Sequence, residues 1–333
     1  MQPRTAPDSP RAGARASRPQ RALSGAVHEC ARSPQLPLIS TSIPPAGTFA
    51  GLNNQLEQLR ALLRSYGSCL VAYSGGVDSV LLAFVAHEVL GARALAVIAD
   101  SPSLPRRELE EALELGRRFN FPVRIVKTGE FDNASYTANP SNRCYFCKHE
   151  LFEDITPIAR AEGFAVIAYG ENASDLADFR PGALAAKEFQ VRAPLKEAGL
   201  TKADIRALSA QLGLPTADKP QMACLSSRIP HGQVVTPAKL LMVESAETVL
   251  RELGFYDVRV RHHEAPGVLA IPGVALALAR IEVGVAELPK LLEAGLRDRV
   301  TAALKGIGYT AVEVDTQGYR RGSLNNLAAN APG

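Results

Sequence analysis

The chain has 333 residues, which is enough for about two domains of ordinary size. Apolar residues make up 46% and charged residues 21%, as in soluble globular proteins, and no apolar run reaches the ~20 residues that a membrane-spanning helix needs. The net charge of +3 comes from the Arg-rich first 46 residues, so the rest of the chain lacks the basic excess typical of nucleic-acid-binding proteins.

Residues 1–46 are rich in Pro, Ala, Arg and Ser and show no periodicity, which predicts a disordered tail. An organelle-targeting peptide or a start codon assigned too early are the alternatives. The five cysteines are an odd number, and the N-terminus has no apolar signal segment, which favours reduced thiols in the cytoplasm. Residues 328–333 are predicted to be a disordered end.

The segment 47–232 alternates between strand and helix patterns. A leucine stripe predicts a helix over 52–63, and three further helices are predicted at 80–90, 105–120 and 146–162. Short apolar runs predict strands at 68–73, 94–99, 123–127 and 165–169. This alternation is typical of an α/β fold with a doubly wound parallel sheet, in which ligands bind beyond the carboxyl ends of the strands.

The pattern changes after residue 232. Helices are predicted at 237–253 and 287–304, and strands at 256–262, near 268–271 and at 309–314. Together they predict a smaller α+β domain over residues 233–327, serving substrate binding or oligomerisation.

A glycine-rich turn joins the first predicted strand to the next helix. It reads Ser74-Gly75-Gly76-Val77-Asp78-Ser79. Adjacent glycines let the backbone approach an anion closely, and helix N-terminal amides and Ser hydroxyls can hold phosphate oxygens. Asp78 is suited to Mg²⁺, and the Lys of a Walker A motif is absent. An ordinary turn capped by Asp and Ser is the simpler alternative. The hexapeptide resembles the PP-loop of ATP pyrophosphatases, which implies that ATP is bound and cleaved to AMP and pyrophosphate.

A second segment supports this interpretation. Ala193-Pro194-Leu195 is followed by Lys202, which opens a predicted helix. Lys202 resembles the Lys that contacts pyrophosphate in several PP-loop families, and the alternative is a solvated Lys at a helix start.

Three cysteines form a further pattern. Cys144 and Cys147 have the C-x-x-C spacing that lets two sulfurs bind one metal or cluster, and Cys224 follows 77 residues later. Three ligands to a [4Fe–4S] cluster would leave one iron open for sulfur chemistry. A zinc site completed by His149, a redox dithiol and unrelated cysteines remain alternatives. His262 and His263 are expected to be structural or on the surface, and Asp100 is either near the nucleotide or a solvated strand-end acid.

These and further motifs together resemble the LarE family over about residues 50–327. The motifs are Ser74–Ser79, Asn142–Lys148, Gly170–Asp175 with Asp178–Gly182, Asp218-Lys219-Pro220, Ala223–Gly232 and Gly318–Asn325. The resemblance implies adenylation of a carboxylate of pyridinium-3,5-biscarboxylic acid mononucleotide and sulfur insertion, as a step in making the nickel-pincer cofactor. It also implies one of two sulfur routes. In one, Cys224 gives up its own sulfur; in the other, Cys144, Cys147 and Cys224 hold a [4Fe–4S] cluster, and this chain resembles the second type.

The remaining site residues follow from the same resemblance and from residue chemistry. Arg228, Arg259 and Arg261 are candidates for the substrate phosphate, because Arg matches phosphate oxygens, although a solvated strand edge would give the same pattern for Arg259 and Arg261. Glu171 and Asp175 are candidates to assist Asp78 with Mg²⁺. The expected partner is a small-molecule nucleotide, with no nucleic acid or membrane, and the family's habit implies a homo-oligomer.

Two other functions fit parts of the sequence. One is a tRNA thiolase or an amide-forming enzyme like NAD or GMP synthase, but the near-neutral folded part argues against tRNA and the cysteine trio is not needed for amidation. The other is a non-catalytic nucleotide-binding regulator on the same fold. Formation of AMP and pyrophosphate separates an enzyme from a regulator.

Overall fold

The computed structural model describes residues 46–177, 181–221, 223–265 and 276–320, with the side chains of residues 46–50, 176, 177 and 265 left undescribed. The predicted tail up to residue 45, the predicted strand near 268–271 and the predicted end at 328–333 lie outside these ranges. No helix within these ranges is both long and apolar enough to cross a membrane.

Four parallel strands form the first sheet, in the order β3-β2-β1-β4. They are β1 Cys69–Tyr73, β2 Ala94–Asp100, β3 Val123–Lys127 and β4 Val166–Tyr169. Cys69 on β1 lies beside Ala94 on one side and Val166 on the other. The chain adds β2 and β3 on one side of β1 and then crosses to place β4 on its other side, so the carboxyl end of β1 is the switch point at which such sheets bind ligands. The prediction of a parallel α/β sheet is confirmed.

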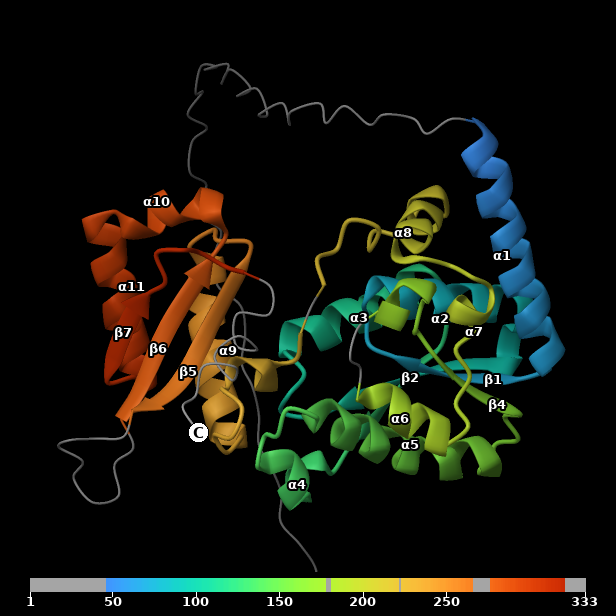
Figure 1. The fold of residues 1–333 in the computed structure, drawn as a ribbon, viewed down its shortest axis with the longest axis horizontal. Helices are drawn as coiled ribbons and strands as arrows, with labels where there is room; N and C mark the ends of the chain where they lie inside the picture. Colours follow the sequence, from blue (N-terminus) through green and yellow to red (C-terminus); the bar gives the residue numbers. More distant parts are fainter. Residues whose placement is uncertain (1–45, 178–180, 222, 266–275, 321–333) are drawn as a thin grey trace, which may run out of the picture. The chain divides into compact units, whose positions relative to one another are not determined.

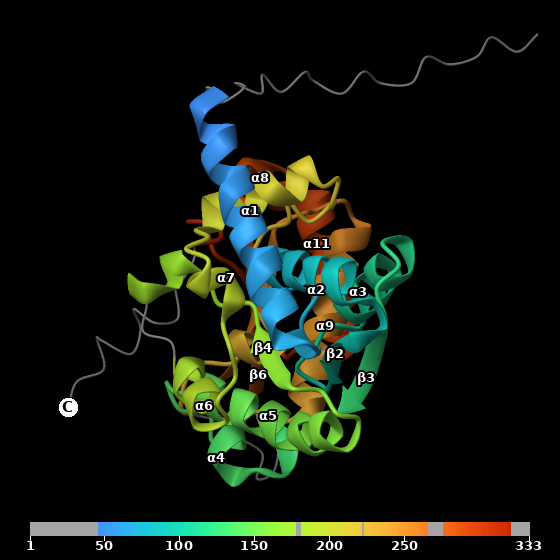
Figure 2. The ribbon, with the colours of Figure 1, turned by 90° about the vertical axis from the view of Figure 1, so that its right-hand side faces the viewer.

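Helices cover both faces of this sheet (Figures 1 and 2). On one face, Cys69, Val71 and Tyr73 of β1 pack in a core with α1 Ala46–Tyr66, α2 Val77–Leu90, α3 Arg106–Arg118, α7 Pro194–Glu197 and α8 Lys202–Gln211. On the other face, Leu70 packs with α5 Arg143–Ala161 and α6 Gly182–Glu188. Successive side chains of β1 therefore point to opposite faces of the sheet and pack in the two cores in turn. The short helix α4 Ala134–Thr137 precedes α5.

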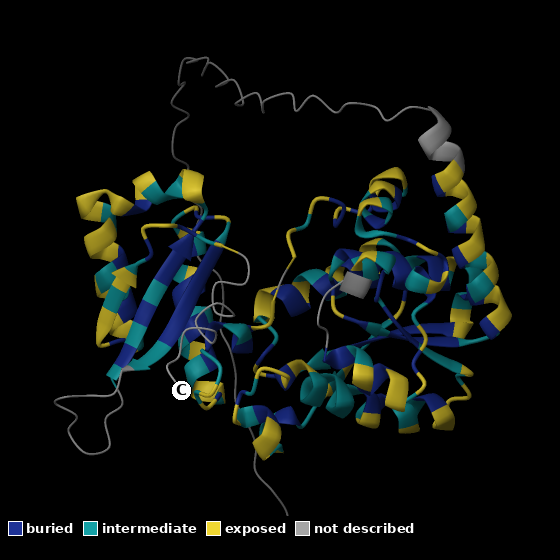
Figure 3. Cartoon of the chain, viewed as in Figure 1, coloured by how far each residue is buried: buried dark blue, intermediate teal, exposed yellow. Residues whose placement is uncertain are grey.

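A second sheet has three strands in the order β5-β6-β7. They are β5 Val258–Ala265, β6 Leu276–Val283 and β7 Ala311–Val314. The β5–β6 pair is antiparallel and the β6–β7 pair is parallel. Helices α9 Pro237–Glu252, α10 Leu288–Leu292 and α11 Ala294–Ile307 share a separate hydrophobic core with this sheet. Figure 3 colours much of β5 and β6 as buried.

The sequence prediction failed at two places in this second part. Strand β6 was not predicted, because its sequence contains Arg280 and Glu282 and so lacks a continuous apolar run. The single helix predicted over 287–304 was wrong, because the chain breaks at Glu293 between α10 and α11, where ψ is 125°.

Candidate functional site

The glycine-rich loop lies at the carboxyl end of β1, as its sequence predicts. Gly75 has a positive φ of 71°, and a Cβ there would lie 2.8 Å from the Cβ of Ala112 on α3, so only glycine fits. The Ser79 hydroxyl accepts from the Ser74 backbone N–H (3.1 Å) and lies 3.1 Å from the Ser74 hydroxyl. The loop is thus closed on itself, and Gly76 caps the start of α2. A loop of this shape directs helix N-terminal amides toward an anion.

Asp78 and Lys202 meet at this loop although 124 residues separate them. The Lys202 ammonium forms an ion pair with one Asp78 carboxylate oxygen, and the Asn172 amide donates to the other (3.2 Å). Lys202 is the first residue of α8, where Thr201 and Asp204 form a capping box. Both partners remain partly exposed, at 32% for Lys202 and 20% for Asp78. The pair can therefore exchange its protein contacts for a nucleotide and a metal ion.

One cavity of about 520 Å³ joins the loop to two of the cysteines. Its wall includes Ser74, Gly76 and Asp78 from the loop, and Cys147 and Cys224 from elsewhere in the chain. Further cations on the same wall are Lys148, Lys202, Arg206 and Lys219. A polyphosphate bound at the loop and a sulfur nucleophile would thus share one chamber.

Two of the three cysteines of the sequence pattern lie on one helix, and the third lies near Arg143, the first residue of that helix. Cys144 and Cys147 lie in the first turns of α5, and Cys224 precedes the short 3-10 turn Leu225–Arg228, where its thiol is exposed and lies 3.9 Å from the Arg143 guanidinium. Burial raises the pKa of Cys147, and the nearby charges of Cys224, Glu130 and Cys144 raise it further. Cys144 and Cys224 therefore lie within electrostatic range of Cys147, although Cys144 does not line the cavity.

A metal-binding arrangement is a separate question. Within the part of the chain that the structure describes, no group of three or more His, Cys, Asp or Glu side chains is arranged so that it could hold a metal ion. The thiols have the right chemistry for an iron–sulfur cluster, but they do not stand in a ligand arrangement. His149, the zinc alternative, instead pairs with Glu153 and packs on the ring of Phe189.

The predicted magnesium residues lie beside the loop but have protein partners. Glu171 accepts hydrogen bonds from the Tyr169 hydroxyl and from Lys196 (2.9 Å), and Asp175 accepts from the Asn172 backbone N–H (3.1 Å). Burial raises the pKa of Glu171, but these donors outweigh it and hold the pKa below its usual value. Glu171 shares a small cavity of about 180 Å³ with Asp78, whereas Asp175 lines the larger one.

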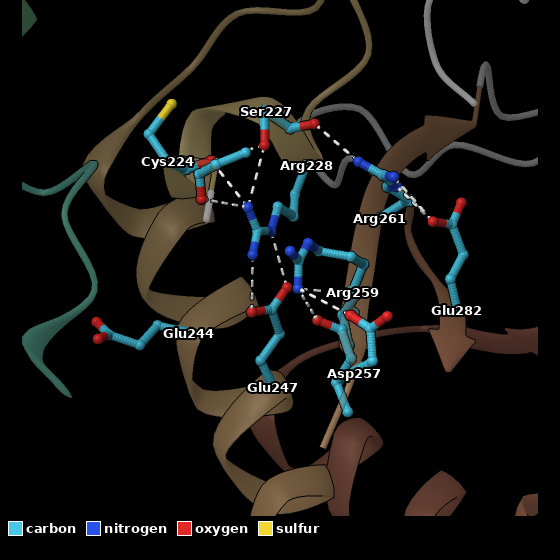
Figure 4. Close-up of polar contacts among 12 residues, drawn as sticks. Cys224, Ser227, Arg228, Glu244, Glu247, Asp257, Arg259, Arg261 and Glu282 are labelled. Atoms are coloured by element: carbon cyan, nitrogen blue, oxygen red, sulfur yellow. Dashed lines mark hydrogen bonds and ion pairs between the residues drawn. The ribbon is translucent and has the colours of Figure 1, made fainter. Parts of the chain in front are cut away.

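The three predicted phosphate-binding arginines lie side by side, as Figure 4 shows. Arg228 is fully buried and clamps Glu247 of α9 through Nε (2.8 Å) and Nη2 (3.1 Å). Its Nη1 donates to the carbonyl oxygens of Ala223 and Cys224. The buried Arg228 guanidinium therefore joins Glu247 to the turn that carries Cys224, and its assignment to the substrate phosphate stays a prediction.

Arg261 and Arg259 differ in their protein partners. Arg261 donates to Glu282 of β6 through Nε and Nη2, and to the Ser227 carbonyl oxygen through Nη1 (3.0 Å). Arg259 is also buried, but it lies 3.8 Å from Asp257 and faces the ring of Tyr319. Burial and the charge of Arg228 lower its pKa. Arg259 lines a second cavity of about 850 Å³, so it is the best placed of the three to meet a ligand.

Two lysines at the site had no assigned role in the sequence analysis. Lys148 passes over the Tyr169 ring (4.6 Å to the centroid), and a Cβ on Gly182 would lie 2.5 Å from its Cδ, so this glycine makes room for it. Lys219 lines both large cavities. Lys148 follows Cys147, and Lys219 lies between Asp218 and Pro220. Both belong to motifs on which the family resemblance rests, and this was the sequence feature that could have pointed to them. Asp100, in contrast, pairs with Arg106 and is not on the cavity wall.

Comparison with known proteins places the chain. No family model matches it. A pyridinium-3,5-bisthiocarboxylic acid mononucleotide synthase from Lactiplantibacillus plantarum is 32% identical over 85% of this chain and 98% of its own length. The chain belongs to this synthase family, the LarE family.

Two further relatives match the chain over different lengths. An uncharacterized protein from Synechocystis sp. is 41% identical to this LarE family member over 83% of the chain and 98% of its own length. A GMP synthase from Phenylobacterium zucineum is 26% identical over 57% of the chain and 41% of its own length. The GMP synthase match supports membership of the wider PP-loop superfamily.

Proposed function

We propose that this protein is an ATP-dependent, AMP-forming sulfur transferase. Its substrate would be pyridinium-3,5-biscarboxylic acid mononucleotide, and its product a thiocarboxylate on the way to the nickel-pincer cofactor. The name of the Lactiplantibacillus plantarum relative supports the substrate class. The observation that carries the proposal is the cavity shared by the phosphate loop, Cys147 and Cys224, because adenylation and sulfur transfer must act on the same carboxylate.

The first step would take place at the loop. The loop amides and Lys202 hold the β- and γ-phosphates, and Asp78 turns from Lys202 to Mg²⁺. A carboxylate oxygen of the substrate attacks the α-phosphorus, and pyrophosphate leaves with the electron pair of the broken P–O bond. The product is an acyl adenylate, in which the former carboxylate oxygen leaves readily as part of AMP.

The second step would use sulfur from the thiol side of the cavity. In the sacrificial route, the Cys224 thiolate attacks the acyl carbon, AMP leaves, and a thioester forms. Loss of the Cys224 α-proton then breaks its Cβ–S bond, which leaves the sulfur on the substrate and a dehydroalanine in the chain. The exposed position of Cys224, on a turn fixed by Arg228, suits this attack.

The cluster route needs Cys144 and Cys147 as well. These two residues and Cys224 would hold a [4Fe–4S] cluster, which supplies sulfide when bound and allows repeated turnover. The electrostatic effect of Cys144 and Cys224 on Cys147 supports this route. Binding a cluster would require the three side chains to move, because among the described residues they form no ligand arrangement.

The substrate phosphate would lie in the neighbouring cavity. This cavity shares Glu108, Lys219 and Pro220 with the nucleotide cavity, so the two cavities adjoin. Arg259 on its wall is the proposed phosphate contact, and Arg228 and Arg261 hold the surrounding backbone in place.

The test is product analysis with the purified protein, ATP, Mg²⁺ and the biscarboxylate mononucleotide. We expect AMP and pyrophosphate only when the substrate is present, and a product in which one oxygen is replaced by sulfur. Cys224→Ala should still release pyrophosphate when the acyl adenylate forms, and AMP when water hydrolyses that intermediate, but should give no sulfur-containing product. ATP binding without AMP formation in any condition would instead indicate a nucleotide-binding regulator.

Iron and acid-labile sulfide content separates the two sulfur routes. About four irons and four sulfides per chain in anaerobically purified protein, lost in Cys144→Ala, would support the cluster. An iron-free protein that loses the mass of hydrogen sulfide during turnover would support the sacrificial route through Cys224.

A further inference from the structure

Lys219 occupies an unusual position for a lysine outside the phosphate loop. Its ammonium lies 2.6 Å from Glu108, 3.2 Å from Glu111 and 3.4 Å from the carbonyl oxygen of Gly75 in the loop. Its side chain is only 14% exposed. Lys219 thus sits between helix α3 and the loop, on the wall of the nucleotide cavity.

Helix α3 packs against the loop and carries two glutamates close to it. A Cβ on Gly75 would lie 2.8 Å from the Cβ of Ala112 on α3, and the Ala112 carbonyl oxygen accepts from the Tyr73 hydroxyl (3.0 Å). The same helix carries Glu108, which lines the nucleotide cavity, and Glu111 one turn away. Two carboxylates beside a polyphosphate site would repel ATP, so a cation between them and the loop has an electrostatic role.

We propose that Lys219 is a phosphate-binding residue of the nucleotide site, held by Glu108 and Glu111 until ATP arrives. When the polyphosphate occupies the loop, the ammonium turns from Glu111 to a phosphate oxygen while keeping its place beside Gly75. The partner is the triphosphate of ATP, because Lys219 lies next to the loop residues that line the cavity. This inference rests on the proposed function only for the existence of the ATP site.

The competing explanation is a purely structural lysine that braces α3 against the loop. The two explanations give opposite signs for Glu111. If Glu111 competes with ATP for Lys219, its removal should tighten nucleotide binding. If the Glu111–Lys219 ion pair only braces the loop, its removal should weaken nucleotide binding.

The experiment is calorimetric titration of the full chain with Mg²⁺ and α,β-methylene-ATP, which cannot be cleaved between the α- and β-phosphates. We expect Lys219→Met to bind about tenfold or more weakly, the loss expected for one hydrogen bond to a charged group, and Lys219→Arg to recover part of it. Glu111→Gln should bind about threefold more tightly. Glu114→Gln removes a charge from the same helix without touching Lys219, and should change the affinity less than Glu111→Gln.

The double variant Lys219→Met/Glu111→Gln completes a double-mutant cycle. The gain in nucleotide affinity from Glu111→Gln should disappear when Lys219 is absent. Circular dichroism and thermal melting confirm that each variant is folded. Equal binding by wild type and Lys219→Met, or weaker binding by Glu111→Gln, would overturn the assignment while leaving the ATP site intact. No binding by the wild type would overturn the ATP site itself and this assignment with it.

Discussion

The ion pairs around Asp78 and those around Arg228 use the same kinds of side chain for different ends. Near the loop, Asp78, Lys202 and Lys219 are partly exposed and line cavities, so their partners can be replaced by a ligand. The turn that carries Cys224 is held by a buried pair. The side chains of Arg228 and Glu247 are 0% and 1% exposed, and their polar atoms contact protein groups. The proposed function therefore assigns ligand binding to the partly exposed pair at the loop and a structural role to the buried Arg228–Glu247 pair.

The pKa values support the same distinction. Burial raises the pKa of Glu247, but the adjacent Arg228 guanidinium outweighs it and holds the pKa below its usual value. Glu247 also accepts from Arg251 and from the Val260 backbone N–H (3.1 Å). It therefore ties α9, β5 and the Cys224 turn together as one charged but saturated cluster.

The largest expected effect comes from breaking this buried cluster. Glu247→Gln would leave Arg228 as an uncompensated buried charge, and the free energy of unfolding should fall by about 3–5 kcal/mol. Urea unfolding followed by circular dichroism measures this loss. A decrease below about 1 kcal/mol, the range of an exposed pair, would show that the two regions are not as different as their burial suggests.

A substitution in the loop should reduce activity much more than stability. In Asp78→Asn, AMP formation should fall about 100-fold or more, because the carboxylate that would hold Mg²⁺ is lost. The free energy of unfolding should change by about 1 kcal/mol or less, since the Asp78–Lys202 pair is partly exposed. Initial rates and urea unfolding on the same preparation test both statements. Full activity in Asp78→Asn would remove the loop from the mechanism.

A smaller effect concerns pH and the second sheet. Burial, with a further contribution from Lys239, lowers the pKa of His262 to about 4, while Glu264 raises it and His263 lowers it slightly. Because the unfolded chain takes up a proton near pH 6.5 and the folded chain does not, the folded state loses stability as pH falls from about 7 toward 4.

His262→Phe is the matched variant for this effect, since a ring is kept beside Tyr309. Melting temperatures between pH 7 and pH 4.5 should fall less steeply in the variant than in the wild type. His262 should account for a loss of about 2 kcal/mol in the free energy of unfolding over this pH range. Parallel curves would mean that His262 is protonated in the folded protein.

The loop was predictable because its chemistry is local. Two glycines, an Asp and two Ser between a strand and a helix predict a tight turn, and the structure has that turn. That the turn binds ATP stays a prediction. The position of Lys202 at the start of a helix was also predicted correctly, and its contact with pyrophosphate stays a prediction. The parallel sheet followed from the alternation of apolar runs and helix patterns.

The surroundings of the arginines were not predictable in the same way. Strand alternation places Arg259 and Arg261 on one face, but it does not say which residues face them. Glu247 comes from α9 and Glu282 from β6, a strand that the sequence analysis missed. The C-x-x-C spacing likewise places Cys144 and Cys147 on one helix without giving their distance to Cys224, which depends on the packing of a turn 77 residues away.

The most direct test of the central claim, that nucleotide and thiols share one cavity, is the alkylation rate of each cysteine by iodoacetamide. The protein is first freed of metal, and the rates are compared with and without Mg²⁺ and α,β-methylene-ATP. The account predicts that nucleotide slows alkylation of Cys224 severalfold and that Asp78→Asn abolishes this protection. Cys144, which is exposed and does not line the cavity, is the internal reference and should change less. An unchanged Cys224 rate at saturating nucleotide would contradict the shared cavity.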